Sequence, residues 1–256
     1  MRRQVLPEPD VDSFFAEVLR AGPNIPMIRA ALEQRAPDDA LLVAVLRRAV
    51  PVRFLEHVGT VPPWSDHPLV LGGVVRNRKT PRVLALKLLP YLVWRDLAEA
   101  AASPWLQGAV RARAEGLLKE MIPEMRLGER VTCARLATPA ALHLLLVDTD
   151  KRVVEASLEN PRLREEDLLL WIRSTEAPVL LLDTTTASSR WGHRYAVRLA
   201  LALQPRTPLS LALGQLSSLV RSDLLRVSET PGLKPLVQAA ASRVARDKLT
   251  EAQGAQ

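Results

Sequence analysis

The chain has 256 residues, a formal net charge of +7 and one cysteine, Cys133. A single cysteine excludes an intrachain disulfide, and no stretch of about 18 uncharged apolar residues that could span a membrane is present. The first residues are Pro-rich and acidic where a signal peptide needs an apolar core, so we expect a cytoplasmic protein with no membrane partner.

The N-terminal part of the chain indicates a series of short helices. Residues 1–9 are expected to form a flexible arm, followed by a helix that begins near Asp10 and continues to Gly22. Further helices are expected after Pro26 and after Asp38. Aromatic residues make up only 4% of the chain, while leucine, alanine and arginine are frequent, which favours helices over strands throughout.

Two long segments, 64–119 and 191–246, resemble each other without a gap at an offset of 127 residues. In each copy a Thr-Pro pair is expected to begin a helix, and an aspartate is expected to cap the next one. Apolar residues from Leu209 to Val220 recur at intervals of three and four, which predicts one continuous helix. The shared residues include Trp64 and Trp191, Thr80-Pro81 and Thr207-Pro208, Asp96 and Asp223, and Pro104 and Pro231.

A smaller period of about 42 residues relates segments within these copies, and Asn77, Asn160 and Gln204 occupy matching junctions in it. Paired helices with this period resemble HEAT and armadillo-type repeats, and the junctions resemble the Asn-Pro-x-x-Pro turns of bacterial HEAT-like repeat proteins. The resemblance implies an all-α fold, a right-handed α-solenoid of about five or six helical hairpins. Residues 10–249 would form this single domain, and residues 250–256 a flexible tail.

Several features are interpreted as structural rather than chemical. Residues 183–189, which are small and polar, are expected to form an exposed turn between two helices. Gly72 and Gly73 are expected to allow close helix packing rather than to form a phosphate loop. The histidines have no metal-binding spacing, and the ten residues between Cys133 and His143 are not a specific thiol-base spacing, so we expect neither metal nor cofactor.

Arginines are the one feature that points to a binding surface. Three of them follow one another at intervals of four residues and are expected to share one helix face, and three further cations follow helix ends at matching junctions. Such a ridge could follow a phosphate backbone. Cations at helix C-termini also interact favourably with unpaired carbonyl groups, by about 0.3–1 kcal/mol. We favour this structural role over a phosphate-binding ridge. The candidate binding residues are Arg190, Arg194, Arg198, Lys79, Arg162 and Arg206.

The resemblance specifies a shape and very little chemistry. We therefore expect a non-enzymatic scaffold that binds another protein, with the oligomeric state left open. The alternative is a nucleic-acid-binding protein, since some HEAT-like bacterial proteins are DNA glycosylases that hold alkylated DNA in a basic concave face, with tryptophans and an aspartate near the lesion. Trp94, Trp105 and Trp171 do not recur between repeats, but Asp96 has a counterpart in Asp223.

Overall fold

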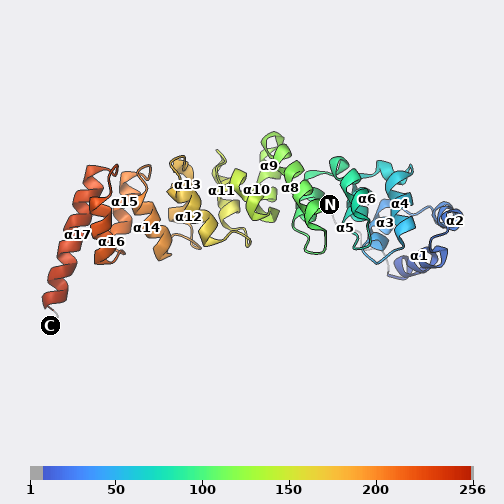
Figure 1. Ribbon diagram of the computed structural model, residues 1–256, viewed down its shortest axis with the longest axis horizontal. Coiled ribbons are helices and arrows are strands. Elements are labelled where there is room, and N and C mark those ends of the chain that lie inside the picture. The colour runs from blue at the N-terminus through green and yellow to red at the C-terminus, as the bar shows by residue number, and fades with distance from the viewer. Residues whose placement is uncertain (1–7, 255–256) are drawn as a thin grey trace. The chain divides into compact units, whose positions relative to one another are not determined.

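A computed structural model describes residues 8–254, and within this range the secondary structure is helical with no strand (Figure 1). The prediction of an all-α fold is therefore confirmed. None of the helices in this range combines the length and the apolar character needed to cross a membrane. The chain divides into two compact units, Met1–Glu124 and Met125–Gln256.

The described part of the first unit, residues 8–124, contains eight α-helices. Their order along the chain gives two alternating rows, because α1 contacts α3, α3 contacts α5 and α5 contacts α7, while α2 contacts α4, α4 contacts α6 and α6 contacts α8. The bounds are α1 Glu8–Ala21, α2 Ile25–Arg35, α3 Asp39–Leu46, α4 Val52–Thr60, α5 Pro68–Arg76, α6 Arg82–Leu88, α7 Trp94–Ala101 and α8 Gly108–Met121, with short 3-10 turns at Trp64–Asp66, Leu89–Tyr91 and Ile122–Glu124.

The second unit alternates in a similar way. Helix α11 contacts both α9 and α13, α15 contacts α17, and α14 contacts both α12 and α16. In each of these pairs the two helices are two apart in the sequence, with one intervening helix in the other row (Figure 1). The bounds are α9 Leu127–Leu136, α10 Pro139–Leu145, α11 Lys151–Leu158, α12 Glu165–Arg173, α13 Val179–Ala187, α14 Tyr195–Leu203, α15 Leu209–Leu216, α16 Arg221–Glu229 and α17 Pro235–Gly254.

Helix α11 illustrates how the sequence specifies these short elements. The Asp150 side chain accepts a hydrogen bond from the Arg152 amide and so caps a helix end whose first N–H groups have no partner. Val153, Val154 and Ser157, with others at the same spacing, are buried on one face. An eight-residue helix is too short to be stable alone, so burial of this face against its neighbours provides most of its stability.

The helix starts differ in detail from those expected. Pro81 and Pro208 occupy the N-cap positions of α6 and α15, and the Thr80 hydroxyl donates instead to the Val74 carbonyl of the preceding helix. Asp96 and Asp223 do not cap α7 and α16. The positions before these helices are taken by Val93 and Val220, so each aspartate lies in a first turn, where its charge still favours the positive helix end.

Two expected boundaries are wrong. The apolar stripe from Leu209 to Val220 is divided between α15 and the turn before α16. Residues 183–187 do not form an exposed turn but complete α13. Thr184 and Thr186 donate their hydroxyl protons to the carbonyl groups four residues earlier, so these polar side chains are compatible with the helix that contains them.

The repeat also has a different content from the one expected. From the start of α11 at Lys151 to the start of α14 at Tyr195, an interval near the proposed period, the chain forms three helices rather than a pair. Trp64 and Trp191 lie in different surroundings, because Trp191 is 1% exposed while Trp64 is partly exposed in a 3-10 turn. Sequence similarity over this offset therefore does not place the two indoles equivalently.

The ends of the chain are more helical than expected. Helix α1 begins at Glu8, so the last two residues of the expected N-terminal arm belong to it, and residues 1–7 lie outside the described residues. Helix α17 continues to Gly254, which includes most of the segment expected to be a flexible tail, and residues 255–256 lie outside the described range.

Candidate functional site

The three junction amides have the same structural role. Asn160 is fully buried, and its Nδ2 donates to the Ala134 and Ala137 carbonyl oxygens at 2.6 and 3.1 Å, while its Oδ1 accepts from the Arg162 amide at 2.7 Å. Asn77 and Gln204 make the same three kinds of bond. Each amide ties the end of one helix to the end of the helix two before it, and this explains why the junctions match in sequence.

The first group of predicted binding arginines does not share a helix face. Helix α14 begins at Tyr195, so Arg190 lies in the preceding turn, Arg194 is at the N-cap position, and only Arg198 is within the helix. Arg190 donates to the carbonyl oxygens of Leu158, Asn160 and Leu163 at 3.3, 2.7 and 3.0 Å. Arg194 pairs with Glu165, and the Arg198 Nε donates to the Gly192 carbonyl.

The second group lies in the exposed junctions. The Arg162 guanidinium donates to the Leu136 carbonyl at 2.8 Å, and Arg206 donates to the Thr175 carbonyl at 3.3 Å. Lys79 is exposed, and it belongs to the first unit whereas the other five predicted residues belong to the second. Most of the predicted arginines therefore bond with helix-end carbonyls, as the structural alternative proposed, and the six do not form a single cluster.

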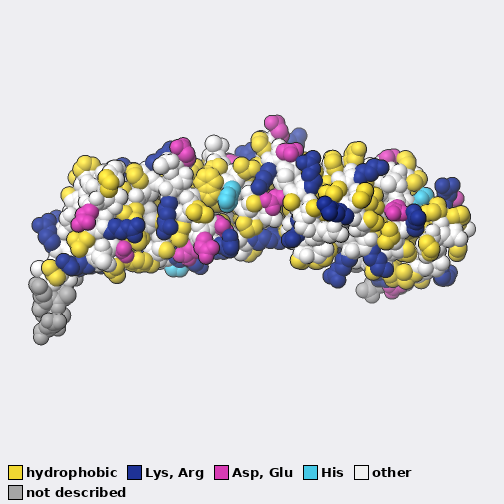
Figure 2. Space-filling model, viewed as in Figure 1, with side chains coloured by type: hydrophobic (Ala, Val, Ile, Leu, Met, Phe, Trp, Pro, Cys, Tyr) yellow, Lys and Arg dark blue, Asp and Glu magenta, His cyan; other side chains and the backbone are white. Residues whose placement is uncertain are grey.

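The surface gives no continuous basic strip on the side that is drawn. Within each unit, lysine and arginine side chains alternate there with acidic and hydrophobic ones (Figure 2). On this face the basic side chains are therefore interspersed with the other types.

A groove in the first unit lies between α3, α5 and α7, and the exposed Trp105 lines it. Its volume is about 460 Å³. The lining residues include Leu46, Arg47, Gly73, Arg76, Arg78, Glu99 and Trp105. The sequence did not indicate this site, because its residues come from three helix ends spread over more than fifty positions and follow no shared spacing.

The indole of Trp105 has two defined contacts although the residue is 51% exposed. Its Nε1 donates to the Arg76 carbonyl at 3.1 Å, and the Arg78 guanidinium lies over the ring, 5.2 Å from its centroid. Trp191 makes the equivalent bond to the Leu158 carbonyl at 2.7 Å. Both tryptophans therefore bond to the carbonyl at a helix end, but they differ in exposure. Trp191 is buried with two arginines over its ring, whereas Trp105 remains accessible.

Asp96 on α7 does not line the groove and is 4% exposed. Its Oδ1 is 2.8 Å from the Arg76 Nη1, and Arg76 also pairs with Glu99. Its Oδ2 has no hydrogen-bond partner among the described residues. A Cβ added to Gly72 would lie 2.6 Å from the carboxyl carbon, so the glycine provides the space for this side chain, and the expectation that it permits close packing is confirmed.

Burial raises the pKa of Asp96 above its ordinary value of 3.8, and the Arg76 charge opposes this rise. A raised pKa means that the folded state binds the Asp96 proton more tightly than the unfolded state does. The stability that this proton provides is present below pH 3.8 and is lost as the pH rises through the folded pKa. We expect Asp96→Asn to be more stable than the wild type at pH 7, with the difference decreasing toward pH 4. Urea denaturation followed by circular dichroism between pH 4 and 8 measures this, and parallel stability curves would contradict it.

The residues considered for chemistry are poorly placed for it. Burial raises the pKa of the Cys133 thiol to about 11, which disfavours the nucleophilic thiolate at neutral pH. His143 packs edge-on against Trp171, with 5.8 Å between the ring centroids. Among the described residues, no group of three or more His, Cys, Asp or Glu side chains is arranged to hold a metal ion.

The HEAT-like resemblance stays a prediction that depends on the junction residues and on the alternating helices. In comparisons with known proteins, no family model, no curated protein and no solved structure matches this chain.

Proposed function

We propose that the chain is a non-enzymatic scaffold in which each unit is a stack of HEAT-like helical hairpins, and that the groove between α3, α5 and α7 binds an acidic segment of another protein. Two observations support the stacked hairpins: helices two apart are neighbours in each unit, and buried amides join their ends. Stacked repeats of this kind offer extended surfaces for partner proteins.

The anchored and half-exposed Trp105 is the observation that carries the binding site. Tryptophan and arginine are the residues that most often dominate the energy of protein interfaces. Because the indole is already fixed by its bond to the Arg76 carbonyl, a partner would lose little entropy in ordering it.

Charge selects the class of partner. Arg76 in this groove is neutralised by Asp96 and Glu99. Arg47 and Arg78 are exposed, and neither has an ion pair among the described residues. Two unneutralised guanidinium groups beside an apolar ring favour a segment that carries carboxylates next to apolar side chains.

The alternative, a nucleic-acid-binding protein or a DNA glycosylase, receives some support from Trp105, since bases stack on exposed aromatic rings. The placement of Asp96 favours the scaffold instead. A catalytic carboxylate must reach its substrate, whereas Asp96 is 4% exposed and packs against Gly72. The bonding of Arg162, Arg190 and Arg206 to carbonyl oxygens also leaves fewer cations for phosphates.

Fluorescence anisotropy with a labelled peptide of alternating glutamate and leucine tests the proposal in the full chain. Binding is expected at physiological salt, and Trp105→Ala should weaken it by about thirtyfold or more, since a central tryptophan contributes about 2 kcal/mol or more to an interface. Arg47→Gln/Arg78→Gln should also weaken it without removing the bond from Trp105 to the Arg76 carbonyl.

Tyr91→Ala is the matched control, because Tyr91 is an aromatic residue that is 67% exposed and does not line the groove. The same peptide with glutamine in place of glutamate should bind weakly. Equal losses in the Tyr91 and Trp105 variants would contradict the groove as the site. Tighter binding of a single-stranded or duplex oligonucleotide, with a steep dependence on salt, would favour the nucleic-acid alternative.

A further inference from the structure

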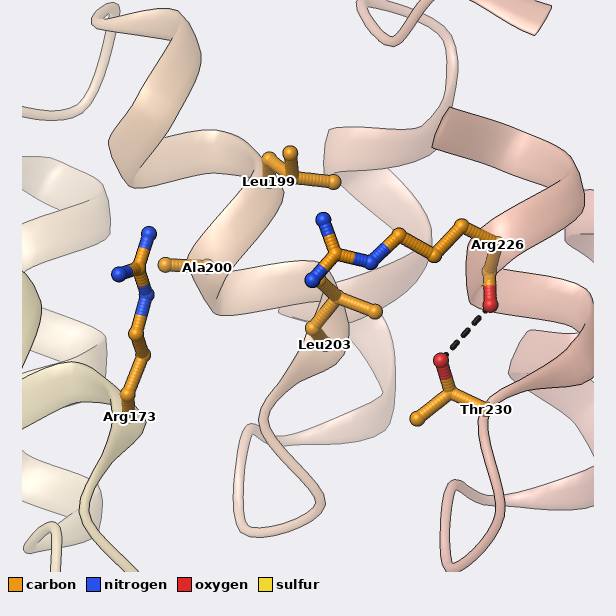
Figure 3. A pocket seen from close by; sticks show the side chains of 6 residues that line it. All are labelled: Arg173, Leu199, Ala200, Leu203, Arg226 and Thr230. Carbon is orange, nitrogen blue, oxygen red and sulfur yellow. Dashed lines mark hydrogen bonds between the residues drawn. The ribbon is translucent and has the colours of Figure 1, made fainter. Parts of the chain in front are cut away.

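A pocket in the second unit lies across helix α14, with α12 on one side and α16 on the other (Figure 3). Its volume is about 230 Å³. Leu199, Ala200 and Leu203 form an apolar floor on α14. Arg173 reaches toward this floor from the end of α12 and Arg226 from α16, so the two guanidinium groups flank α14 from opposite sides (Figure 3).

The two arginines differ from those at the junctions. In the part of the chain that the structure describes, neither the Arg173 nor the Arg226 guanidinium has a hydrogen bond or an ion pair, and both residues are exposed. No carboxylate is among the lining residues. Thr230 donates its hydroxyl proton to the backbone carbonyl of Arg226, a bond that does not involve the guanidinium.

The pair has no acceptor from the protein in this pocket. Both guanidinium groups are exposed, so water hydrates them and screens their repulsion, while the apolar floor supplies no acceptor for their N–H groups. Of the charged groups on the same helices, Arg198 donates to the Gly192 carbonyl, and Asp223 accepts from the Tyr195 hydroxyl and makes no ion pair with Arg226 among the described residues. An anion that enters between the two guanidinium groups would relieve this repulsion and satisfy donors on both.

We propose that this pocket binds a phosphate monoester, with its oxygens between Arg173 and Arg226 and its carbon substituent over Ala200 and Leu203. A phosphate monoester carries about −1.5 to −2 charges at pH 7, which balances two guanidinium groups, whereas a carboxylate balances only one. Its oxygens point in several directions, so it can accept from cations on opposite sides of the pocket. The ester carbon accounts for the apolar floor.

Isothermal titration of the full chain with inorganic phosphate, adenosine monophosphate and a phosphoserine peptide tests this assignment and distinguishes the sources of the group. Arg173→Gln and Arg226→Gln are each expected to weaken binding by about tenfold, and the double variant by about a hundredfold, because each removes charge-assisted hydrogen bonds. Arg221→Gln/Arg243→Gln changes the net charge equally at exposed positions outside the pocket and is expected to leave binding unchanged.

Binding of all three probes, lost in the double variant, would identify the phosphate group itself as the determinant. Tighter binding of the nucleotide or of the peptide would support the proposal and name the natural source. Three results would overturn it: no binding of any probe at physiological salt, equal binding of adenosine or of the unphosphorylated peptide, or an equal loss in the control variant. Because this pocket and the Trp105 groove belong to different units, failure of one assignment leaves the other testable.

Discussion

Replacing Asn160 by leucine is expected to destabilise the second unit by about 3–5 kcal/mol. The side chain is fully buried, and its amide makes three hydrogen bonds that leucine cannot replace. The variant would leave the Ala134 and Ala137 carbonyl oxygens and the Arg162 amide to find other partners, and an unsatisfied buried polar group costs about 1–3 kcal/mol. Urea denaturation followed by circular dichroism gives the change in stability.

Two further variants separate the hydrogen bonds from the change in size. Asn160→Asp keeps the shape and an acceptor for the Arg162 amide, but it cannot donate to the two carbonyl groups, so it is expected to be destabilised to a similar degree. Glu159→Ala changes an exposed neighbour and should shift stability by no more than about 0.5 kcal/mol. A leucine variant as stable as the Glu159 variant would show that the buried amide is dispensable.

The junction amides were visible in the sequence because they act locally and recur. Asn77, Asn160 and Gln204 each lie one or two residues after the end of a helix, and a residue needed at every such end leaves a repeated signal. The helix content expected for this period is wrong, because side-chain amides serve both rows of helices. Asn160 follows the end of α11, whereas Gln204 follows the end of α14 in the other row.

The arginines show why regular spacing alone is insufficient. Arg190, Arg194 and Arg198 have the interval of a helix face, but the chain turns at Trp191 and becomes helical only at Tyr195. That turn is fixed by bonds to the Leu158 carbonyl, which is 33 residues from Trp191 in the sequence. No local pattern can reveal a partner at that distance, so the helix start was placed too early.

Both proposed binding sites have the same origin. Each site is formed by three successive helices of one row within its own unit. The groove at Trp105 lies on α3, α5 and α7, and the pocket between Arg173 and Arg226 lies on α12, α14 and α16. Their residues have no common spacing because the intervening helices and turns differ in length. What the two sites share is an accessible side chain that the sequence does not distinguish from its buried or paired counterparts: Trp105 in the groove, and Arg173 and Arg226 in the pocket.

Gly192→Ala is expected to destabilise the second unit by about 3 kcal/mol, because the turn before α14 has no room for a methyl group. A Cβ at this position would lie 2.3 Å from the Thr186 carbonyl oxygen and 2.9 Å from that of Ser188, and these are backbone atoms that cannot rotate away. Relief would require the turn to move, which would displace the buried Trp191 indole from the Leu158 carbonyl. Urea denaturation measures the loss, and a red shift of tryptophan emission under native conditions would report the displaced indole.

Gly214→Ala makes the same chemical change in the same unit with the opposite expected sign. Gly214 is exposed within α15, and an added Cβ would meet no atom within 4 Å. Alanine there should stabilise the unit by about 0.5–1 kcal/mol, since it loses less backbone entropy than glycine in a helix. If Gly192→Ala were as stable as Gly214→Ala, the turn would have to be pliable, and the fixed position that we assign to Trp191 and to the arginines around it would be wrong.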